Sequence, residues 1–319
     1  MSLLVTGASG FLGRNFLRTL SRECEVTAVY HQSQDFQQFV ESLDHPCIRP
    51  VQLDLANADA SRRLAALGTA FDTCIFLAAN SDPAVSVQKP ALDLRWNALS
   101  VVQLVEQIRF KRFIYFSSGA VYDGLSGAVS PKVPVSPTLP YAISKLAAER
   151  YLHHFQRSGS IEELFIVRFF GAYGPFEPER KIYGRLVRQF AFEKNPRFTL
   201  RGDGRNLIDA MYVDDAIAAV HRLLEAPPPG AILDCASSQP ITLKALVQKA
   251  AELFGLDAEI SYQSVVPEYI EFFSVDDTLR KVYQFTPQID LADGLRRFAE
   301  FLRREPSRPG PPLRTEDAD

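Results

Sequence analysis

Leu3-Leu4-Val5-Thr6-Gly7-Ala8-Ser9-Gly10-Phe11-Leu12-Gly13 is the stretch of sequence that decides the fold. An apolar run ending at Thr6 predicts a buried strand, and the apolar spacing that continues to Leu20 predicts a helix. The three glycines between them permit a tight turn and let a phosphate approach the backbone, where the start of the helix offers unpaired N–H groups. Such glycines often mark only a turn, but their place between a strand and a helix favours a dinucleotide-binding site.

Composition limits the class of protein. The 319 residues, 46% hydrophobic and 23% charged, are typical of a globular chain with one or two domains. A net charge of -3 gives no indication of a nucleic-acid partner, and no apolar run is long enough for a membrane span. The four scattered cysteines form no CxxC pair, so we expect no metal site and a cytoplasmic location. Cys74 and Cys235 lie in apolar, strand-like runs and are expected to be buried thiols.

Strand-like and helix-like patterns alternate over the first two thirds of the chain, which predicts an α/β fold with a parallel sheet covered on both faces. The predicted strands are 2–6, 25–30, 48–52, 72–79, 112–118, 164–170 and 231–236. The predicted helices are 11–22, 33–44, 58–68, 91–109, 140–157 and 212–225.

The alternation stops after Phe170. Residues 171–210 predict loops with one helix at 181–193, and a further helix fits 242–255, with Thr242 as N-cap and Gly255 at its end. Short helices and loops are expected beyond it. The tail 305–319 is rich in proline, arginine and acids, a composition typical of disorder.

Tyr141 and Lys145 are four residues apart in a predicted helix and therefore lie on one face. A lysine ammonium beside a phenol favours the phenolate and lowers its pKa from about 10, which suits proton transfer near neutral pH. The alternative is a surface tyrosine with a solvated lysine.

Two further polar features lie where ligands bind in open α/β sheets. Ser117 and Ser118 end the strand predicted at 112–118, where they either hold a substrate oxygen or cap a turn. Asn97 is an unfavourable residue inside the helix predicted at 91–109, so we expect it to anchor a buried water or a backbone group.

Together these features resemble the extended short-chain dehydrogenase/reductase family, in its nucleotide-sugar epimerase/dehydratase branch. The resemblance covers residues 1 to about 255. Its motifs are Thr6–Gly13, Asp54-Leu55, Leu77-Ala78-Ala79, Asn97, Ser117-Ser118, Tyr141 with Lys145, Arg168–Pro175, Gly202-Asp203-Gly204 and Tyr212–Asp215.

The resemblance implies residue roles. Tyr141 would be the general acid/base, Lys145 would bind the nicotinamide ribose and tune Tyr141, and Ser118 and Asn97 would complete the catalytic group. The implied cofactor-binding residues are Gly7, Ser9, Gly10, Phe11, Leu12, Gly13, Tyr30, His31, Asp54, Leu55, Ala78, Ala79, Asn97, Ser117, Tyr141, Lys145 and Phe170. The implied substrate-binding residues are Asn80, Ser118, Gly119, Tyr141, Gly171, Arg185 and Arg205.

It also implies an architecture. We expect a Rossmann-type doubly wound sheet of about seven strands, built from 1–170 and about 207–238, with a smaller, mostly helical substrate domain built from about 171–206 and 239–304. We expect a homodimer that pairs through the helices at 91–109 and 140–157.

Several positions depart from the family pattern. The second predicted strand ends in Tyr30-His31, with neither the acid that favours NAD nor an arginine that favours NADP, so both cofactors stay open. Gly119-Ala120 stands where the 4,6-dehydratases carry Asp-Glu, which argues against dehydration. Gly171 replaces an asparagine, and Ile208 replaces the arginine that commonly binds the substrate diphosphate.

Other cations would have to replace that arginine. The candidates are Arg180, Lys181, Arg185, Arg201 and Arg205, with solvated loop charges as the alternative. We therefore expect an NAD(P)-dependent epimerase or 4-ketoreductase of a nucleotide-linked sugar. The alternatives are an NADP-dependent reductase of a non-nucleotide carbonyl compound and a non-catalytic dinucleotide sensor.

Overall fold

The computed structural model describes residues 1–67, 71–227, 232–263 and 270–305. Within them, one sheet of seven parallel strands forms the centre of the molecule, in the order β12-β7-β5-β4-β1-β2-β3. Its strands are β1 (Ser2–Thr6), β2 (Glu25–Tyr30), β3 (Ile48–Gln52), β4 (Thr73–Phe76), β5 (Phe110–Ser118), β7 (Ile161–Phe169) and β12 (Ile232–Cys235). This is the Rossmann-type doubly wound sheet predicted from the sequence, and every predicted strand is present.

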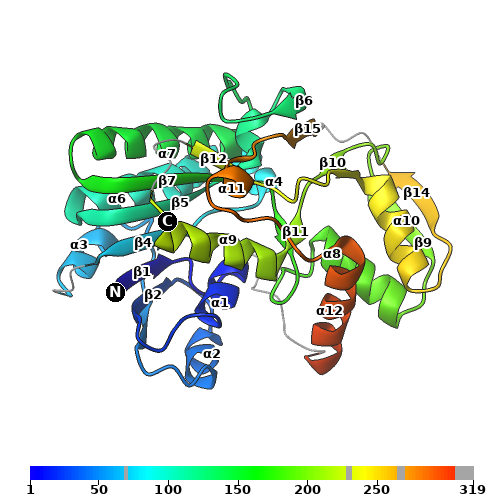
Figure 1. Cartoon of the computed structure of the whole chain (residues 1–319), viewed down its shortest axis with the longest axis horizontal. Helices are drawn as coiled ribbons and strands as arrows, with labels where there is room; N and C mark the ends of the chain where they lie inside the picture. Colours follow the sequence, from blue (N-terminus) through cyan, green and yellow to red (C-terminus); the bar gives the residue numbers. More distant parts are fainter. Residues whose placement is uncertain (68–70, 228–231, 264–269, 306–319) are drawn as a thin grey trace.

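Helices cover both faces of the sheet (Figure 1). One face carries α3 (Ala60–Ala65), η1 (Arg95–Leu99), α6 (Ser100–Gln107) and α7 (Pro140–Arg157). The short helix α5 (Pro90–Leu94) precedes η1 and packs against α7. The other face carries α1 (Phe11–Leu17), α2 (Phe36–Ser42) and α9 (Val213–Glu225). Side chains alternate between the two cores along each strand: Leu4 packs under α6 and α7, whereas Leu3 and Val5 pack toward α1 and α2.

The helix predicted at 91–109 consists of α5, the π-helical turn η1 and α6. Likewise, the helix predicted at 181–193 is α8 (Ile182–Leu186) followed by the π-helical turn η3 (Val187–Phe192). Short π-helical turns inside helices often occur at functional sites, and η1 contains Asn97.

The strand order reverses between β1 and β4, so the loops after these two neighbouring strands diverge at their carboxyl ends. A crevice at such a point is the usual ligand site of open α/β sheets. The glycine turn follows β1 there, the Leu77–Asn80 loop follows β4, and Ser118 ends β5 next to them.

The remaining segments lie beside the carboxyl edge of the sheet (Figure 1). They include α4 (Pro83–Gln88), η2 (Gly119–Tyr122), α10 (Leu243–Leu253), α11 (Thr278–Lys281) and α12 (Leu291–Arg304). Four two-stranded pairs accompany them in the described residues: β6 (Ser126–Val129) with β15 (Glu271–Ser274), β8 (Ala172–Tyr173) with β11 (Met211–Tyr212), β9 (Arg197–Arg201) with β14 (Glu259–Gln263), and β10 (Leu207–Ile208) with β13 (Ile241–Thr242). The expectation of only short helices and loops beyond 255 is therefore wrong, because it omits β14, β15 and the 14-residue helix α12.

Other expectations are met. Thr242 caps α10 by accepting a hydrogen bond from the Ala245 amide at 3.2 Å, and Gly255 follows the helix with a φ of +74°. Cys74 and Cys235 are buried thiols. Across the part of the chain that the structure describes, no helix has the length and apolarity needed to cross a bilayer. Apart from Glu305, the tail expected at 305–319 lies outside the described residues.

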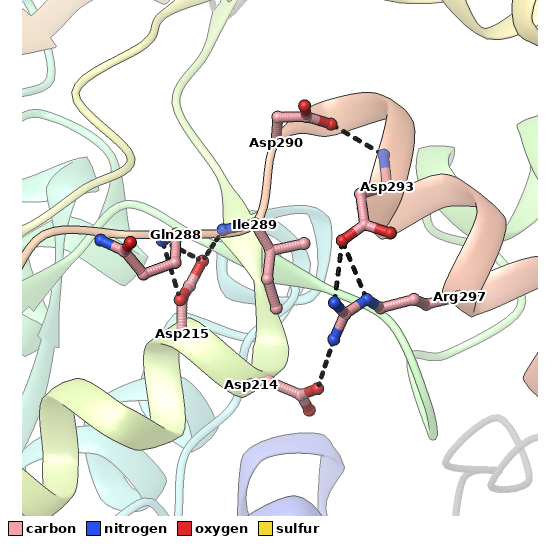
Figure 2. Close-up of polar contacts among 7 residues, drawn as sticks. All are labelled: Asp214, Asp215, Gln288, Ile289, Asp290, Asp293 and Arg297. Atoms are coloured by element: carbon pink, nitrogen blue, oxygen red, sulfur yellow. Dashed lines mark hydrogen bonds and ion pairs between the residues drawn. The ribbon is translucent and has the colours of Figure 1, made fainter.

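Two adjacent aspartates at the start of α9 bind the C-terminal segment to this helix (Figure 2). The buried Asp215 carboxylate accepts the backbone N–H groups of Gln288, at 3.0 Å, and Ile289, at 2.8 Å. Asp214 lies 3.9 Å from the guanidinium of Arg297 on α12, in an exposed ion pair. The two aspartates thus differ in burial while binding the same segment.

This difference predicts unequal effects on stability. Asp215→Ala removes a buried carboxylate that accepts two partly buried backbone N–H groups and is expected to cost about 2–3 kcal/mol of unfolding free energy. Asp214→Ala removes only an exposed ion pair and is expected to cost less than about 1 kcal/mol. Urea denaturation of the two variants measures both values, and equal losses would contradict this account of the contact.

Candidate active site

The glycine turn is packed against the loop after β4. Gly7 has a φ of +64°, and a Cβ at this position would lie 2.7 Å from the amide nitrogen of Ala78. A Cβ at Gly13 would lie 2.5 Å from the carbonyl oxygen of Ala8. Two of the three glycines are therefore required by the fold. Gly10 is exposed and is the N-cap of α1, so the surface above it is open to a ligand.

Arg14 joins the glycine turn to the loop after β2. Its buried guanidinium donates to the Ser9 carbonyl at 2.9 Å, to Ser33 Oγ at 2.8 Å and to Asp35 Oδ1 at 2.7 Å. It also lies 4.7 Å from the centre of the Phe39 ring. Sequence reasoning missed Arg14, although an arginine directly after the third glycine was visible. It fixes the position of the loop where the adenosine ribose of a dinucleotide would lie.

The other residues expected around the adenosine lie close together. His31 Nε2 is 3.7 Å from Asp54 Oδ2, and Asp54 Oδ1 accepts the Ala56 amide at 3.0 Å. Tyr30 packs on the Phe36 ring, with a centroid separation of 4.8 Å. Leu55 is buried beside the same strand ends. The loops after β2 and β3 thus form one polar surface.

Ser118, Tyr141 and Lys145 meet at the carboxyl end of β5. A hydrogen bond joins the side chains of Ser118 and Tyr141, while Lys145 Nζ donates to the Phe116 carbonyl at 2.7 Å and lies 4.9 Å from the centre of the Tyr115 ring. Tyr141 and Lys145 belong to successive turns of α7, and the contact of α7 with β5 brings them to Ser118. The structure therefore assembles the predicted serine, tyrosine and lysine in one site.

Burial sets the proton affinities of this group. The pKa of Tyr141 is raised above its ordinary value, because desolvation and the negative charge of Asp93 raise it by more than the Ser118 hydrogen bond lowers it. The expectation that this pKa is lowered is therefore not met in the enzyme without ligands. Desolvation lowers the pKa of Lys145 to about 8, against the opposing effect of Asp93 and Glu149. Lys145 can therefore change its charge close to neutral pH, and any anion nearby influences how much of it is protonated.

Asn97 organises the loop after β4. Its Oδ1 accepts the backbone amide of Asn80 at 2.7 Å, and its Nδ2 donates to Asp93 Oδ1 at 2.8 Å and to Ser144 Oγ at 3.2 Å. Of the two expectations for Asn97, anchoring a backbone group is the one that the hydrogen bonds support. Through Asn80, Asn97 also fixes the loop containing Ala78 and Ala79.

A second buried polar cluster lies behind Lys145. Ser117 Oγ donates to Glu149 Oε1 at 2.5 Å, and Arg168 donates to both oxygens of Glu149 at 3.1 and 2.8 Å. Ser117 thus directs its hydroxyl to Glu149. On the far side, Tyr122 donates to Asp234 Oδ1 at 2.8 Å. The sequence does contain a sign of this cluster, because Arg168 and Asp234 are charged residues inside apolar stretches of their strands.

The predicted substrate residues form two groups, one near the Tyr141 site and one of basic residues in the C-terminal part. Gly119 lies against the Phe170 ring, and a Cβ added at Gly119 would lie 3.1 Å from that ring. Gly171 has a φ of +135° and lies beside Ala210. That backbone conformation favours glycine, which explains why no asparagine stands there. Asn80 lies next to the Tyr141 site through its contact with Asn97.

The predicted basic residues lie in the C-terminal part. Arg185 is exposed and its guanidinium lies 5.0 Å from the Phe198 ring, and Arg205 is exposed and pairs with Asp203 at 2.5 Å. Arg180 pairs with Asp82 at 3.4 Å and so joins the segment before α8 to the loop that contains Asn80.

Comparison with known proteins agrees with this geometry. The family model described as "NAD dependent epimerase/dehydratase family" matches residues 3–235, which include the glycine turn, Asn97, Ser118, Tyr141 and Lys145. The chain belongs to this family. It is therefore an enzyme of the nucleotide-sugar branch of the extended short-chain dehydrogenases/reductases, as the motifs predicted.

Several relatives span nearly the whole chain. A UDP-glucose 4-epimerase from Mycolicibacterium smegmatis is 26% identical over 96% of this chain and 99% of its own length. A dTDP-glucose 4,6-dehydratase from Streptomyces griseus is 26% identical over 92% and 91%. The UDP-glucuronic acid 4-epimerase from Bacillus cereus, solved with UDP-glucuronic acid and NAD, is 25% identical over 96% of this enzyme and 100% of that chain, with a TM-score of 0.84. MoeE5, solved with UDP-glucuronic acid and NAD, is 27% identical over the same shares, with a TM-score of 0.83.

Proposed function

We propose that the enzyme is an NAD-dependent epimerase that inverts C4 of a UDP-linked sugar. The observation that carries this proposal is the meeting of Ser118, Tyr141 and Lys145 at the carboxyl end of β5, on the same edge of the sheet as the glycine turn after β1. UDP-sugar epimerases among its relatives and structural neighbours support the choice of reaction and substrate class. They do not favour the carbonyl reductase, and retention of Tyr141 and Lys145 argues against a non-catalytic sensor.

The residues present fit a dinucleotide. The open surface over Gly10 accepts a pyrophosphate without a side-chain clash, and the first amides of α1 point toward it. His31, Asp54 and Leu55 would border the adenosine, and Lys145 and Phe170 would border the nicotinamide end. The Asp54 carboxylate beside His31 and the two structural neighbours solved with NAD support NAD over NADP. When held by the glycine turn and Lys145, NAD would supply the reversible hydride acceptor that the oxidation of the sugar carbon needs.

The protein supplies the proton transfers and the positioning. Tyr141 accepts the proton of the sugar hydroxyl as the carbon is oxidised. It returns the proton to the ketone oxygen after the sugar has rotated to present its opposite face. The Lys145 ammonium stabilises the phenolate form of Tyr141, and Ser118 holds the substrate oxygen beside the phenol. Gly119-Ala120 carries no acid or base for water elimination, which supports epimerisation over dehydration.

A product assay tests this function. UDP-glucose, UDP-glucuronic acid and dTDP-glucose are incubated separately with the enzyme and NAD, and the sugars are identified by NMR. The expected result is the C4 epimer of at least one UDP sugar. A 4-keto-6-deoxy product from dTDP-glucose, or an unchanged substrate in every reaction, would contradict the proposal.

We also propose that the enzyme is a cytoplasmic homodimer. Four large apolar side chains of the helices that contain the active site are exposed: Leu94 at 50%, Leu99 at 42%, Ile143 at 46% and Tyr151 at 52%. Burying this surface against the same surface of a second copy would form a four-helix interface. Light scattering at micromolar concentration is expected to give twice the chain mass of 35.7 kDa, and the mass of one chain would refute the dimer.

A further inference from the structure

Four ionisable side chains that normally carry a charge are buried together behind Tyr141. Asp93 is 0% exposed, Lys145 3%, Glu149 1% and Arg168 2%. A charge in such a place is costly unless an opposite charge or several hydrogen bonds compensate it. The pairing among these four groups therefore determines whether each of them stays ionised.

Glu149 and Arg168 compensate each other. The guanidinium donates to both carboxylate oxygens, at 3.1 and 2.8 Å, and Ser117 adds a third hydrogen bond at 2.5 Å. Lys145, in contrast, contacts the Phe116 carbonyl and the Tyr115 ring, both of which are neutral. Glu149 is therefore neutralised by a guanidinium, whereas Asp93 takes part in no ion pair among the described residues.

The Asp93 carboxylate is held by three neutral donors. Asn80 Nδ2 and Asn97 Nδ2 each donate to its Oδ1 at 2.8 Å, and Ser144 Oγ donates to its Oδ2 at 2.6 Å. Ser144 Oγ is also 2.9 Å from the carbonyl oxygen of Tyr141, in the same turn of α7. Asp93 therefore fixes both the helical turn that contains Tyr141 and Lys145 and the loop that contains Asn80.

We propose that Asp93 is the counter-ion of the Lys145 ammonium, acting across the buried site and not as a direct ion pair, and that it positions Tyr141 through the hydrogen bond of Ser144. Its effect on turnover rests on the proposed function, but its effect on Lys145 does not. The groups that face Lys145 are Asp93 from α5, Glu149 and Tyr141 from α7, and Tyr115 from β5, with Arg168 from β7 bound to Glu149.

The sign of the effect follows from this arrangement. Burial lowers the pKa of Lys145, and the negative charge of Asp93 raises it toward its ordinary value. Without that charge the Lys145 pKa falls below about 8, so that the side chain is largely neutral at the pH where wild type keeps it charged. A neutral Lys145 no longer stabilises the Tyr141 phenolate.

Asp93→Asn isolates the charge from the hydrogen bonds. In this variant the asparagine Oδ1 can accept hydrogen bonds from Asn80 and Asn97, and its Nδ2 can donate one to Ser144 Oγ. The Ser144 hydroxyl then donates only to the Tyr141 carbonyl. Ser144→Ala is the matched control, because it removes the hydroxyl between Asp93 and Tyr141 but leaves the charge. If Asp93→Asn does not fold, Asp93→Ser retains an acceptor in a smaller side chain.

The readout is the titration of Lys145 in enzyme without substrate, followed by NMR of lysine labelled with ¹³C at Cε. The sequence has nine lysines, and Lys145→Arg assigns the signal. Asp93→Asn is expected to lower the Lys145 midpoint by about one pH unit or more, as loss of a nearby opposite charge does. An unchanged midpoint, or an equal shift in Ser144→Ala, would overturn the proposal.

Turnover provides the second readout. In Asp93→Asn, kcat is expected to fall more at pH 8 than at pH 6, with little change in KM, because Lys145 is still protonated at the lower pH. A loss of kcat equal at both pH values would indicate a purely structural role and contradict the counter-ion. The NMR titration uses no substrate, so it remains decisive even if the enzyme does not epimerise the sugars tested.

Discussion

Replacing Tyr141 with phenylalanine is expected to lower kcat by about two to four orders of magnitude, the usual share of general acid–base catalysis. The ring remains in its place on α7, but the hydroxyl that bonds Ser118 and exchanges the proton is lost. NAD affinity is expected to change little, because the cofactor contacts of the glycine turn are untouched. The measurement is steady-state turnover of the UDP sugar identified in the product assay, with calorimetric titration of NAD.

Tyr151→Phe is the matched control. Tyr151 is on the same helix but belongs to the surface proposed for the dimer and not to the active site, so loss of its hydroxyl with the ring kept is expected to leave turnover unchanged. If Tyr141→Phe retained turnover within about threefold of wild type, the hydroxyl would contribute almost nothing to the barrier and Tyr141 would not be the acid/base.

The sequence predicted the sheet well because its signals are local. The inner parallel strands such as β1 and β2 are buried on both faces and appear as short apolar runs, and the strand bounds from β1 to β3 match the prediction, although the edge strand β3 is only partly buried. The Tyr141–Lys145 pair was also a local signal, since a spacing of four within one helix determines that the two side chains share a face.

The partners of that pair could not be predicted in the same way. Asn80, Asp93 and Ser144 belong to three separate segments, and the fold alone brings them into contact. A buried Asp93 is indistinguishable in sequence from a solvated aspartate on a helix. Even the π-helical turn around Asn97 leaves the apolar spacing of 91–109 nearly unchanged, so the pattern predicted one continuous helix.

The C-terminal part was missed for two different reasons. β9 and β14 form a parallel pair although about sixty residues separate them along the chain, and the exposed residues of β14 give no apolar run. α12, in contrast, does carry a signal: Leu295, Phe298 and Leu302 are buried at helical spacing among charged residues. The many charged residues of that segment led to the prediction of loops and short helices, although the apolar spacing of a helix was present.

The second large effect is expected at the glycine turn. Gly10→Val should abolish measurable NAD binding, a loss of roughly 100-fold or more in affinity, equivalent to about 2.7 kcal/mol. Gly10 has ordinary extended backbone angles, with φ of -76°, so valine imposes no left-handed strain there. Its Cβ would meet only the Gly7 carbonyl oxygen, at 3.1 Å, and the rest of the side chain would occupy the space over the turn that a pyrophosphate needs.

Gly13→Ala provides the contrast that separates binding from folding. Its Cβ would lie 2.5 Å from the Ala8 carbonyl oxygen inside the turn, so this smaller substitution is expected to destabilise the fold by about 1–3 kcal/mol. Thermal melts should therefore rank Gly13→Ala below Gly10→Val, whereas NAD titration of the folded proteins should rank them in the opposite order. If folded Gly10→Val bound NAD as tightly as wild type, the pyrophosphate could not lie over this turn, because the added methyl groups would occupy its place.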